Sequence, residues 1–306
     1  ARAGYYERRG FKQLSPLERR LLAADVIANE IPMEEIPTRV LATAFATGKE
    51  EAAVPVMVEI PGDKFLAGDQ GERATAEIYV YANDAENRMR DFFVQGIGID
   101  LTASRAKLLA GGLKYYGELR LPPGEYRLRT LVRNASTGRM GLTVFSLHVP
   151  AFAPGEPYLV PPVFLESAGD WMSVGGRGTG ANGGIEGSSY PFLSLGATDM
   201  WPAALPRFRP GDASRVSLVA YHFGGAETGE LRLGSQILAS DGKPIEGAGK
   251  LTVVGKSAPE ADGKRVLLLS FTTPQGLAPG RYGLRIVLED PTTGQARHAS
   301  APFLVP

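Results

Sequence analysis

Two stretches of the chain carry nearly the same pattern of apolar and polar residues. Residues 121–150 read LPPGEYRLRTLVRNASTGRMGLTVFSLHVP and residues 277–306 read LAPGRYGLRIVLEDPTTGQARHASAPFLVP, with matching positions offset by 277 − 121 = 156. After a Pro-Gly turn, apolar and polar residues alternate in each copy, and a period of two is typical of a strand with one buried face. The polar segments NASTG and DPTTG predict hairpin loops. The chain therefore contains two copies of one β-hairpin unit.

The motif L-x-P-G-x-Y-x-L opens both copies. It resembles the tyrosine corner of immunoglobulin-like and fibronectin-type-III-like sandwiches, in which a tyrosine hydroxyl binds backbone upstream of it. The motif predicts a structural role for Tyr126 and Tyr282, with Gly124 and Gly280 in the preceding turns. A role of these tyrosines in ligand contact is the less favoured alternative.

Further strands are predicted before each hairpin, in segments rich in β-branched and aromatic residues. They cover 38–46, 51–60, 74–82, 91–99 and 113–121 in the first unit, and 157–165, 215–223, 229–238, 250–255 and 265–273 in the second. The first unit then has the seven strands of a simple sandwich. The predicted fold class is all-β, with two tandem immunoglobulin-like (fibronectin-III-like) β-sandwich domains and a short N-terminal helix.

Three parts follow along the chain. Residues 1–34 form an N-terminal tail and helix, which we expect to include the end of an upstream domain because no initiator methionine is present. Residues 35–152 form the first sandwich. Residues 153–306 form the second, with a Gly-rich loop at 167–192.

The N-terminal helix is predicted from its start signal and its apolar spacing. Ser15 and Glu18 form a capping box around Pro16, and Pro32 ends the segment. One apolar stripe recurs at helical spacing, and we expect it to pack across a sandwich or against a neighbouring domain. Its residues are Leu17, Leu21, Ala24, Ala28 and Ile31. A membrane-anchoring helix is the less favoured alternative, because this stripe carries alanine at Ala24 and Ala28 in place of bulky residues.

Charge and composition exclude several classes of function. The 306 residues include 33 Lys and Arg, 33 Asp and Glu, and no Cys. A balanced charge gives no electrostatic basis for binding nucleic acid or anionic membranes. Without cysteine there are no disulfides, zinc–thiolate sites or thiol nucleophiles. No apolar run approaches 18 residues, so no transmembrane segment is predicted.

Three motifs together resemble the acidobacterial von Willebrand factor A-related proteins: ARAGYYE, SPLERRLLAADVIANEIPMEEIPTRVLATAF and LPPGEYRLRTLVRN. In that family a von Willebrand A domain is followed by a short helical link and a β-rich C-terminal region. The resemblance implies that residues 1–12 end such an A domain and that its metal site lies upstream. It also implies an exported, non-enzymatic protein that acts in adhesion or assembly.

Two segments offer candidate binding chemistry. Asp100, Thr102 and Ser104 look like the Asp-x-Ser-x-Ser arrangement that holds Mg²⁺ in A domains. A strand-to-turn transition is favoured at these positions, so no metal site is assigned. In the Gly-rich loop, Trp171, Arg177 and Tyr190 are candidates for contact with a partner protein or a glycan.

No catalytic site or cofactor site is assigned. The histidines, at 148, 222 and 298, lack metal-ligand spacing, and no G-x-S-x-G motif occurs. The sequence favours a non-enzymatic structural or interaction protein, exported to the periplasm, the outer surface or the medium, that contacts other protein subunits in an envelope-associated or extracellular assembly. A carbohydrate-binding module using Trp171 and Tyr190 is the first alternative. The second alternative is a hydrolase on a β scaffold, whose two acidic residues would be far apart in the sequence and close together in the fold.

Overall fold

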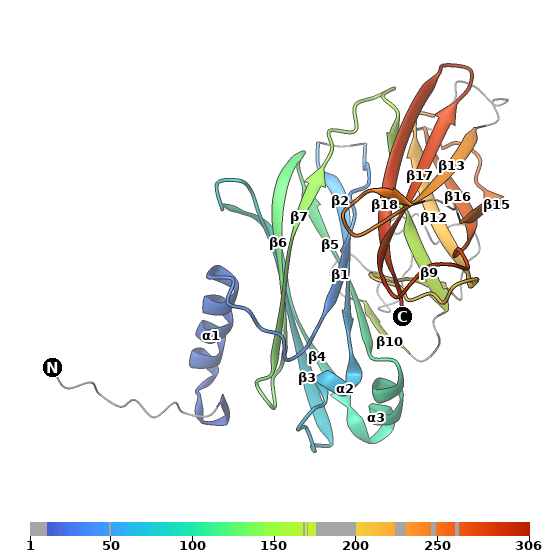
Figure 1. Cartoon of the computed structure of the whole chain (residues 1–306). Coiled ribbons are helices and arrows are strands. Elements are labelled where there is room, and N and C mark those ends of the chain that lie inside the picture. The colour runs from blue at the N-terminus through green and yellow to red at the C-terminus, as the bar shows by residue number, and fades with distance from the viewer. Residues whose placement is uncertain are drawn as a thin grey trace.

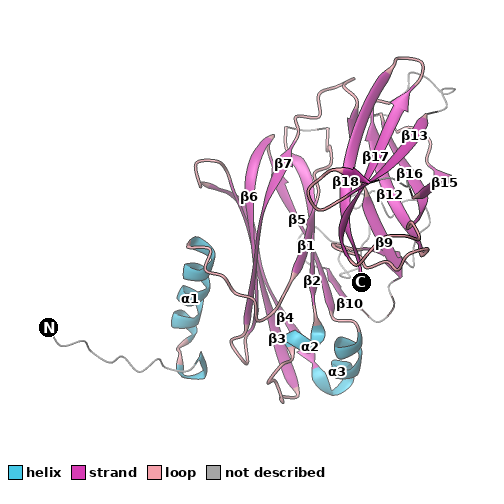
Figure 2. Cartoon of the chain, in the orientation of Figure 1, coloured by secondary structure: helices cyan, strands magenta, loops and turns pink. Residues whose placement is uncertain are grey.

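The computed structural model describes residues 11–48, 50–167, 169, 171–175, 200–223, 231–245, 249–260 and 263–306. In this part of the chain most residues lie in strands, and the prediction of an all-β fold built from sandwiches with a short N-terminal helix is confirmed (Figure 2). None of the described helices has the length and apolar character that crossing a bilayer requires.

The first sandwich consists of two four-stranded sheets, here called sheets A and B. Sheet A has the order β4 (Met89–Asp100), β3 (Arg73–Asn83), β6 (Gly124–Asn134) and β7 (Met140–Val149). Sheet B has the order β1 (Arg39–Ala42), β2 (Ala52–Ile60), β5 (Leu113–Leu121) and β10 (Met172–Gly175). The inward residues of both sheets form one apolar core, which includes Val56, Ile78 and Leu128.

The second sandwich is formed by sheets C and D. Sheet C has the order β11 (Met200–Pro202), β9 (Val163–Ser167), β12 (Ala213–Tyr221), β16 (Lys264–Thr272) and β15 (Lys250–Lys256), with β8 (Tyr158–Leu159) also beside β12. Sheet D has the order β14 (Pro244–Ile245), β13 (Arg232–Leu238), β17 (Gly280–Asp290) and β18 (Gln295–Val305). Their shared core contains Phe164, Phe271 and Phe303, whose rings contact one another.

The two repeated hairpins pair in the same register. In β6–β7, Gly124 lies opposite Val149, and in β17–β18, Gly280 lies opposite Val305. The tyrosines are also equivalent, since the Tyr126 hydroxyl donates to the Pro122 carbonyl at 2.7 Å and that of Tyr282 to the Ala278 carbonyl at 2.8 Å. Each glycine lies beside its own tyrosine ring, so a Cβ at Gly124 or Gly280 would meet that ring at 3.5 or 3.6 Å. The repeat in sequence is thus a repeat in backbone pairing.

The two sandwiches stack face to face. Figure 1 shows α1, the first sandwich and the second sandwich next to one another in that order. A separate apolar cluster fills the space between sheets B and C, with Met57 and Tyr116 on one side and Val163 and Val219 on the other. Every residue of β2 is buried, because one face of sheet B meets the first core and the other meets sheet C.

Helix α1 (Pro16–Ala28) has the predicted capping box, but the predicted apolar stripe does not pack across the sandwich. Ala23, Val26 and Ile27 are buried against sheet A, whereas Leu17 and Leu21 are 66% and 59% exposed. The buried stripe packs on Leu131 and Met140 of sheet A, and the short side chain of Ala23 lets the helix approach the sheet closely. A 3₁₀ turn, η1 (Phe11–Gln13), precedes α1.

The segment 167–192, predicted as a loop, contains strand β10. Residues Met172–Gly175 pair in parallel with Leu113–Tyr116 of β5, in the first sandwich. The correction has a simple cause: β5 carries unpaired backbone groups on the side away from β2, and an extended segment satisfies them. Residues that follow the linker between the two sandwiches (residues 150–157) therefore add a strand to sheet B of the first sandwich.

Glu30, just after helix α1, forms ion pairs that connect this end of the helical segment to sheet A. Its carboxylate binds the guanidinium groups of Arg127 and Arg129 on β6. The hydrogen bond from Arg127 has the largest effect on the Glu30 pKa and lowers it, and burial, which comes next, raises it. The hydrogen bond from Arg129 and the charges of both arginines add to the lowering, which takes the pKa from 4.5 to about 2. The ionised form is therefore preferred in the folded protein.

We predict that Glu30→Gln lowers the free energy of unfolding by about 1–2 kcal/mol at pH 7, allowing for a side chain that is 26% exposed. Because the folded pKa is depressed, the contribution is complete above about pH 4.5 and is lost as pH falls toward about 2. Urea unfolding between pH 7 and pH 3 measures it. The exposed Glu34→Gln is the matched control, and equal effects of the two variants would contradict this role.

The two tyrosine corners differ in burial, which gives a second prediction. Tyr126 is 5% exposed, whereas Tyr282 is only half-buried. Tyr126→Phe leaves the Pro122 carbonyl without its buried donor and should cost about 1–2 kcal/mol, while Tyr282→Phe should cost less because water replaces the hydroxyl. Chemical denaturation of both variants measures the difference, and a larger loss for Tyr282→Phe would overturn the interpretation.

Candidate functional site

A row of charged side chains crosses the face of sheet B that meets sheet C. Arg39 lies opposite Glu59, and Glu59 lies opposite Lys114, on three neighbouring strands. The Lys114 ammonium is fully buried and lies 3.1 Å from a Glu59 carboxylate oxygen. The alternation of β5 explains the position, since Leu113 and Tyr115 face the first core and Lys114 and Tyr116 face sheet C.

The second sandwich completes the shell around Lys114. The Glu166 carboxylate of β9 binds the ammonium, and the Pro202 carbonyl of β11 accepts a hydrogen bond from it at 2.6 Å. Trp171, which leads into β10, lies with its ring centroid 4.7 Å from the same nitrogen. Glu59 also accepts a hydrogen bond from the Ala204 amide at 2.9 Å. One buried cation therefore joins side chains and backbone of both sandwiches.

The environment of Glu166 differs from that of an ordinary surface carboxylate. Burial raises its pKa, while the nearby Lys114 ammonium opposes the rise. Its side chain is 33% exposed and lines a groove of about 710 Å³ together with Trp171, Arg39 and Arg207. Among the described residues, the carboxylates that form ion pairs with Lys114 are those of Glu59 and Glu166. This ammonium supplies their counter-charge, as in a structural ion cluster.

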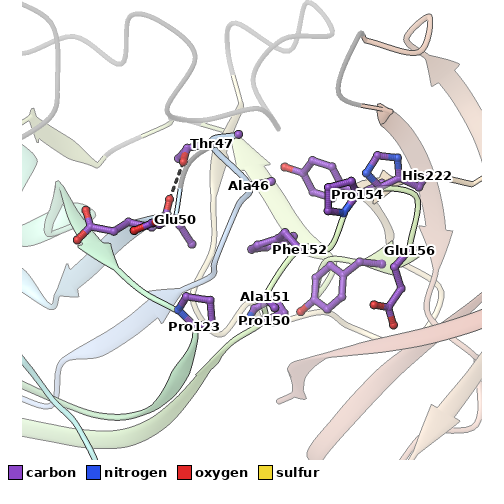
Figure 3. A pocket seen from close by; sticks show the side chains of 15 residues that line it. Ala46, Thr47, Glu50, Pro123, Pro150, Ala151, Phe152, Pro154, Glu156 and His222 are labelled. Atoms are coloured by element: carbon purple, nitrogen blue, oxygen red, sulfur yellow. Dashed lines mark hydrogen bonds between the residues drawn. The ribbon is translucent and has the colours of Figure 1, made fainter.

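A second pocket, of about 560 Å³, opens where the linker between the sandwiches runs past the loop after β1 (Figure 3). Phe152 lies in the middle of its lining, with Thr47 and Glu50 on one side and Pro154, Glu156 and His222 on the other. The Phe152 ring meets those of Tyr158 and Tyr221 edge to face, at centroid distances of 5.1 and 5.4 Å. The linker thus contributes an aromatic surface.

The segment proposed as a weak metal candidate is the start of a helix. Asp100 is the N-cap of α3 (Leu101–Ala110), and its Oδ1 accepts hydrogen bonds from the Thr102 amide and hydroxyl at 2.9 and 2.6 Å. The favoured strand-to-turn transition is therefore corrected to a strand-to-helix transition, because an N-cap aspartate satisfies the first amides of a helix. Ser104 lies inside α3. Across the described residues, no three His, Cys, Asp or Glu side chains cluster as metal ligands.

The other predicted site residues lie apart from one another. Trp171 belongs to the Lys114 cluster, while Arg177 and Tyr190 lie outside the described residues. His148 binds Glu125 on the exposed face of sheet A, His222 lines the second pocket, and His298 is exposed on β18. The structure brings none of the described histidines together.

Sequence reasoning missed Lys114, Glu59 and Phe152. A signal for the first two was present, since each interrupts a strongly apolar strand, in VMVEI and LKYY. A charge inside such a run indicates a buried partner of opposite sign. Phe152 lies in PAFAPGEP (residues 150–157), where the prolines and the glycine predict only a linker between the two units.

No protein-family model matches the chain, and comparison with curated proteins finds no match. Among solved structures, a family 123 glycoside hydrolase from Clostridium perfringens is 14% identical over 33% of this chain and 22% of that chain, with a TM-score of 0.25. A putative membrane-anchored protein from Corynebacterium diphtheriae is 12% identical over 88% of this chain and 58% of that chain, with a TM-score of 0.21. The C-terminal domain of the Streptococcus pyogenes antigen I/II-family protein AspA is 9% identical over 87% of this chain and 99% of that chain, also at 0.21. Likenesses at these TM-scores carry no argument about function.

We predict that Lys114→Met lowers the free energy of unfolding by about 3–5 kcal/mol, because it leaves Glu59 and Glu166 without their buried counter-charge. Adding Glu59→Gln and Glu166→Gln should restore part of the loss. Chemical denaturation measures both effects. The control is Lys64→Met, which removes a lysine with a 54% exposed side chain and should change stability by less than about 0.5 kcal/mol. Equal losses for the two lysines would show that the cluster does not hold the sandwiches together.

Proposed function

We propose that the chain is a non-enzymatic structural or interaction protein that contacts protein subunits in an envelope-associated or extracellular assembly. The supporting observation is strand β4, which pairs with β3 alone among the described strands and exposes large apolar side chains. Met89, Phe92 and Val94 are 52%, 44% and 49% exposed. A long edge strand with such side chains invites pairing or packing with another chain.

The β4 surface is preorganised for such a contact. The Phe92 ring stacks on that of Tyr81 with centroids 5.6 Å apart and planes 6° apart, which fixes the exposed aromatic group. The alternate residues Phe93 and Ile97 are buried in the first core, so the strand itself is held firmly. A rigid aromatic group loses little conformational entropy on binding. Edge strand β15 offers a smaller surface of the same kind, with Val253 and Val254 48% and 47% exposed.

A non-enzymatic role agrees with the arrangement at Lys114. The pair of carboxylates that meets there, Glu59 and Glu166, is bound to a buried ammonium, and Glu59 is itself buried. Glycoside hydrolysis needs one carboxyl to give up a proton and the other to act on the opposite face of a sugar. Here both carboxylates contact the same cation, which suits a structural cluster.

The test is a photo-cross-linking experiment in the native cells. Benzoylphenylalanine at position 92 should form a discrete adduct with one protein in the envelope or secreted fraction, whereas the same probe at the exposed Leu109 of α3 should not. With that partner purified, Phe92→Lys should weaken the complex at least tenfold, as expected for an aromatic contact residue, and Leu109→Lys should leave it unchanged.

Three results would contradict the proposal: no adduct from position 92, residence of the protein in the cytosol, or unaltered affinity of the Phe92→Lys variant. Specific labelling on a glycan array would favour the carbohydrate-binding alternative. Equal thermal stability of the Lys variants and the parent protein ensures that the comparison reports on the surface and not on folding.

A further inference from the structure

Two residues that line the second pocket, the one beside the linker, have unusual backbone conformations. Phe152 has φ 46° and His222 has φ 54°, values that are uncommon for residues other than glycine. Such conformations cost on the order of 1–3 kcal/mol and concentrate at functional sites. At Phe152 the turn places the ring against Tyr158 and Tyr221, between the two sandwiches. The His222 ring is fixed against Gly263, where an added Cβ would lie 2.5 Å from Nδ1.

The walls and rim of the pocket differ in character. Pro123, Pro150 and Pro154 add apolar surface to the aromatic rings. Three exposed carboxylates, of Glu50, Glu51 and Glu156, lie among the lining residues, and none of the described lining residues is Lys or Arg. The ion pairs found within the described parts of the chain include none of these three glutamates. Their charge is therefore not neutralised by the described residues.

We propose that this pocket receives a lysine or arginine side chain of the partner protein, an inference that rests on the interaction role proposed above. Aromatic rings attract a cation through their negative faces, and the attraction grows as the cation is desolvated. The prolines suit the aliphatic stem of the same side chain. The glutamates supply the opposite charge at the rim, where it favours a cationic over a neutral residue. A volume of about 560 Å³ holds such a side chain with adjoining backbone.

The experiment uses the full chain and two short peptides that differ in one group. Acetyl-Gly-Ser-Arg-Ser-Gly-amide is the probe, and its citrulline analogue has nearly the same shape without the charge. In calorimetric or NMR titrations we expect the arginine peptide to bind at least tenfold more tightly than the citrulline peptide. The double variant Glu51→Gln, Glu156→Gln should lose about tenfold for arginine only. Glu72→Gln, an exposed carboxylate at the α3 end, is the control and should change nothing.

Equal affinity for the two peptides, no binding of either, or an unaltered double variant would overturn the proposal. These substitutions lie on exposed side chains, so folding is preserved and can be checked by thermal denaturation. Failure here is distinct from failure of the proposed function. An adduct at position 92 without arginine binding would mean that the partner uses β4 and leaves the pocket empty. Arginine binding without that adduct would keep the pocket and remove the β4 contact.

Discussion

The way in which the two stacked sandwiches are aligned depends on a single buried ammonium. Lys114 has no exposed surface, and its partners come from both sandwiches: Glu59 from sheet B, Glu166 and the Pro202 carbonyl from sheet C. A buried charge is tolerated only where its partners are in place, so this group fixes how the sheets meet more than it adds stability. Apolar contacts such as that of Tyr116 with Trp201 supply the attraction, and the ion cluster supplies the register.

The face-to-face arrangement of the two sandwiches creates the second pocket and the Lys114 cluster. The second pocket exists because the linker turns back at Phe152 and packs Tyr158 against the first sandwich. Strand β10 reinforces the arrangement, since it extends sheet B with residues from beyond the linker. The two sandwiches therefore pack against each other and share a sheet, and are not independent domains joined only by a linker. A partner that touches both β4 and the pocket would meet two surfaces held at a constant separation.

The sequence predicted what local periodicity determines. The segment 113–121 coincides with β5, and 51–60 differs by one residue from β2 (Ala52–Ile60). Local periodicity does not predict contacts between residues that are far apart in the chain. Both stripes of α1 are apolar, and only the shape of sheet A decides that Ala23 and Val26 are buried in place of Leu17 and Leu21. Likewise, Glu59 and Lys114 are far apart in the chain, and their opposition follows from strand register. The pairing of β10 with β5 has no local signal either.

The duplicated hairpins reveal which features belong to the fold and which to this stack. In the first copy Arg133 lies opposite Glu77 and binds it, and in the second copy the equivalent Glu289 lies opposite Arg232, with 3.9 Å between the charged atoms. The pair is kept with its charges exchanged, which requires both positions to change, because one change alone would place like charges opposite each other. The surroundings differ: α1 covers Arg133, which is 2% exposed, whereas the side chain of Glu289 is 42% exposed. Opposite charge across these strands is thus a property of the repeated unit, while the burial of Arg133 is a property of the layer that α1 adds to sheet A.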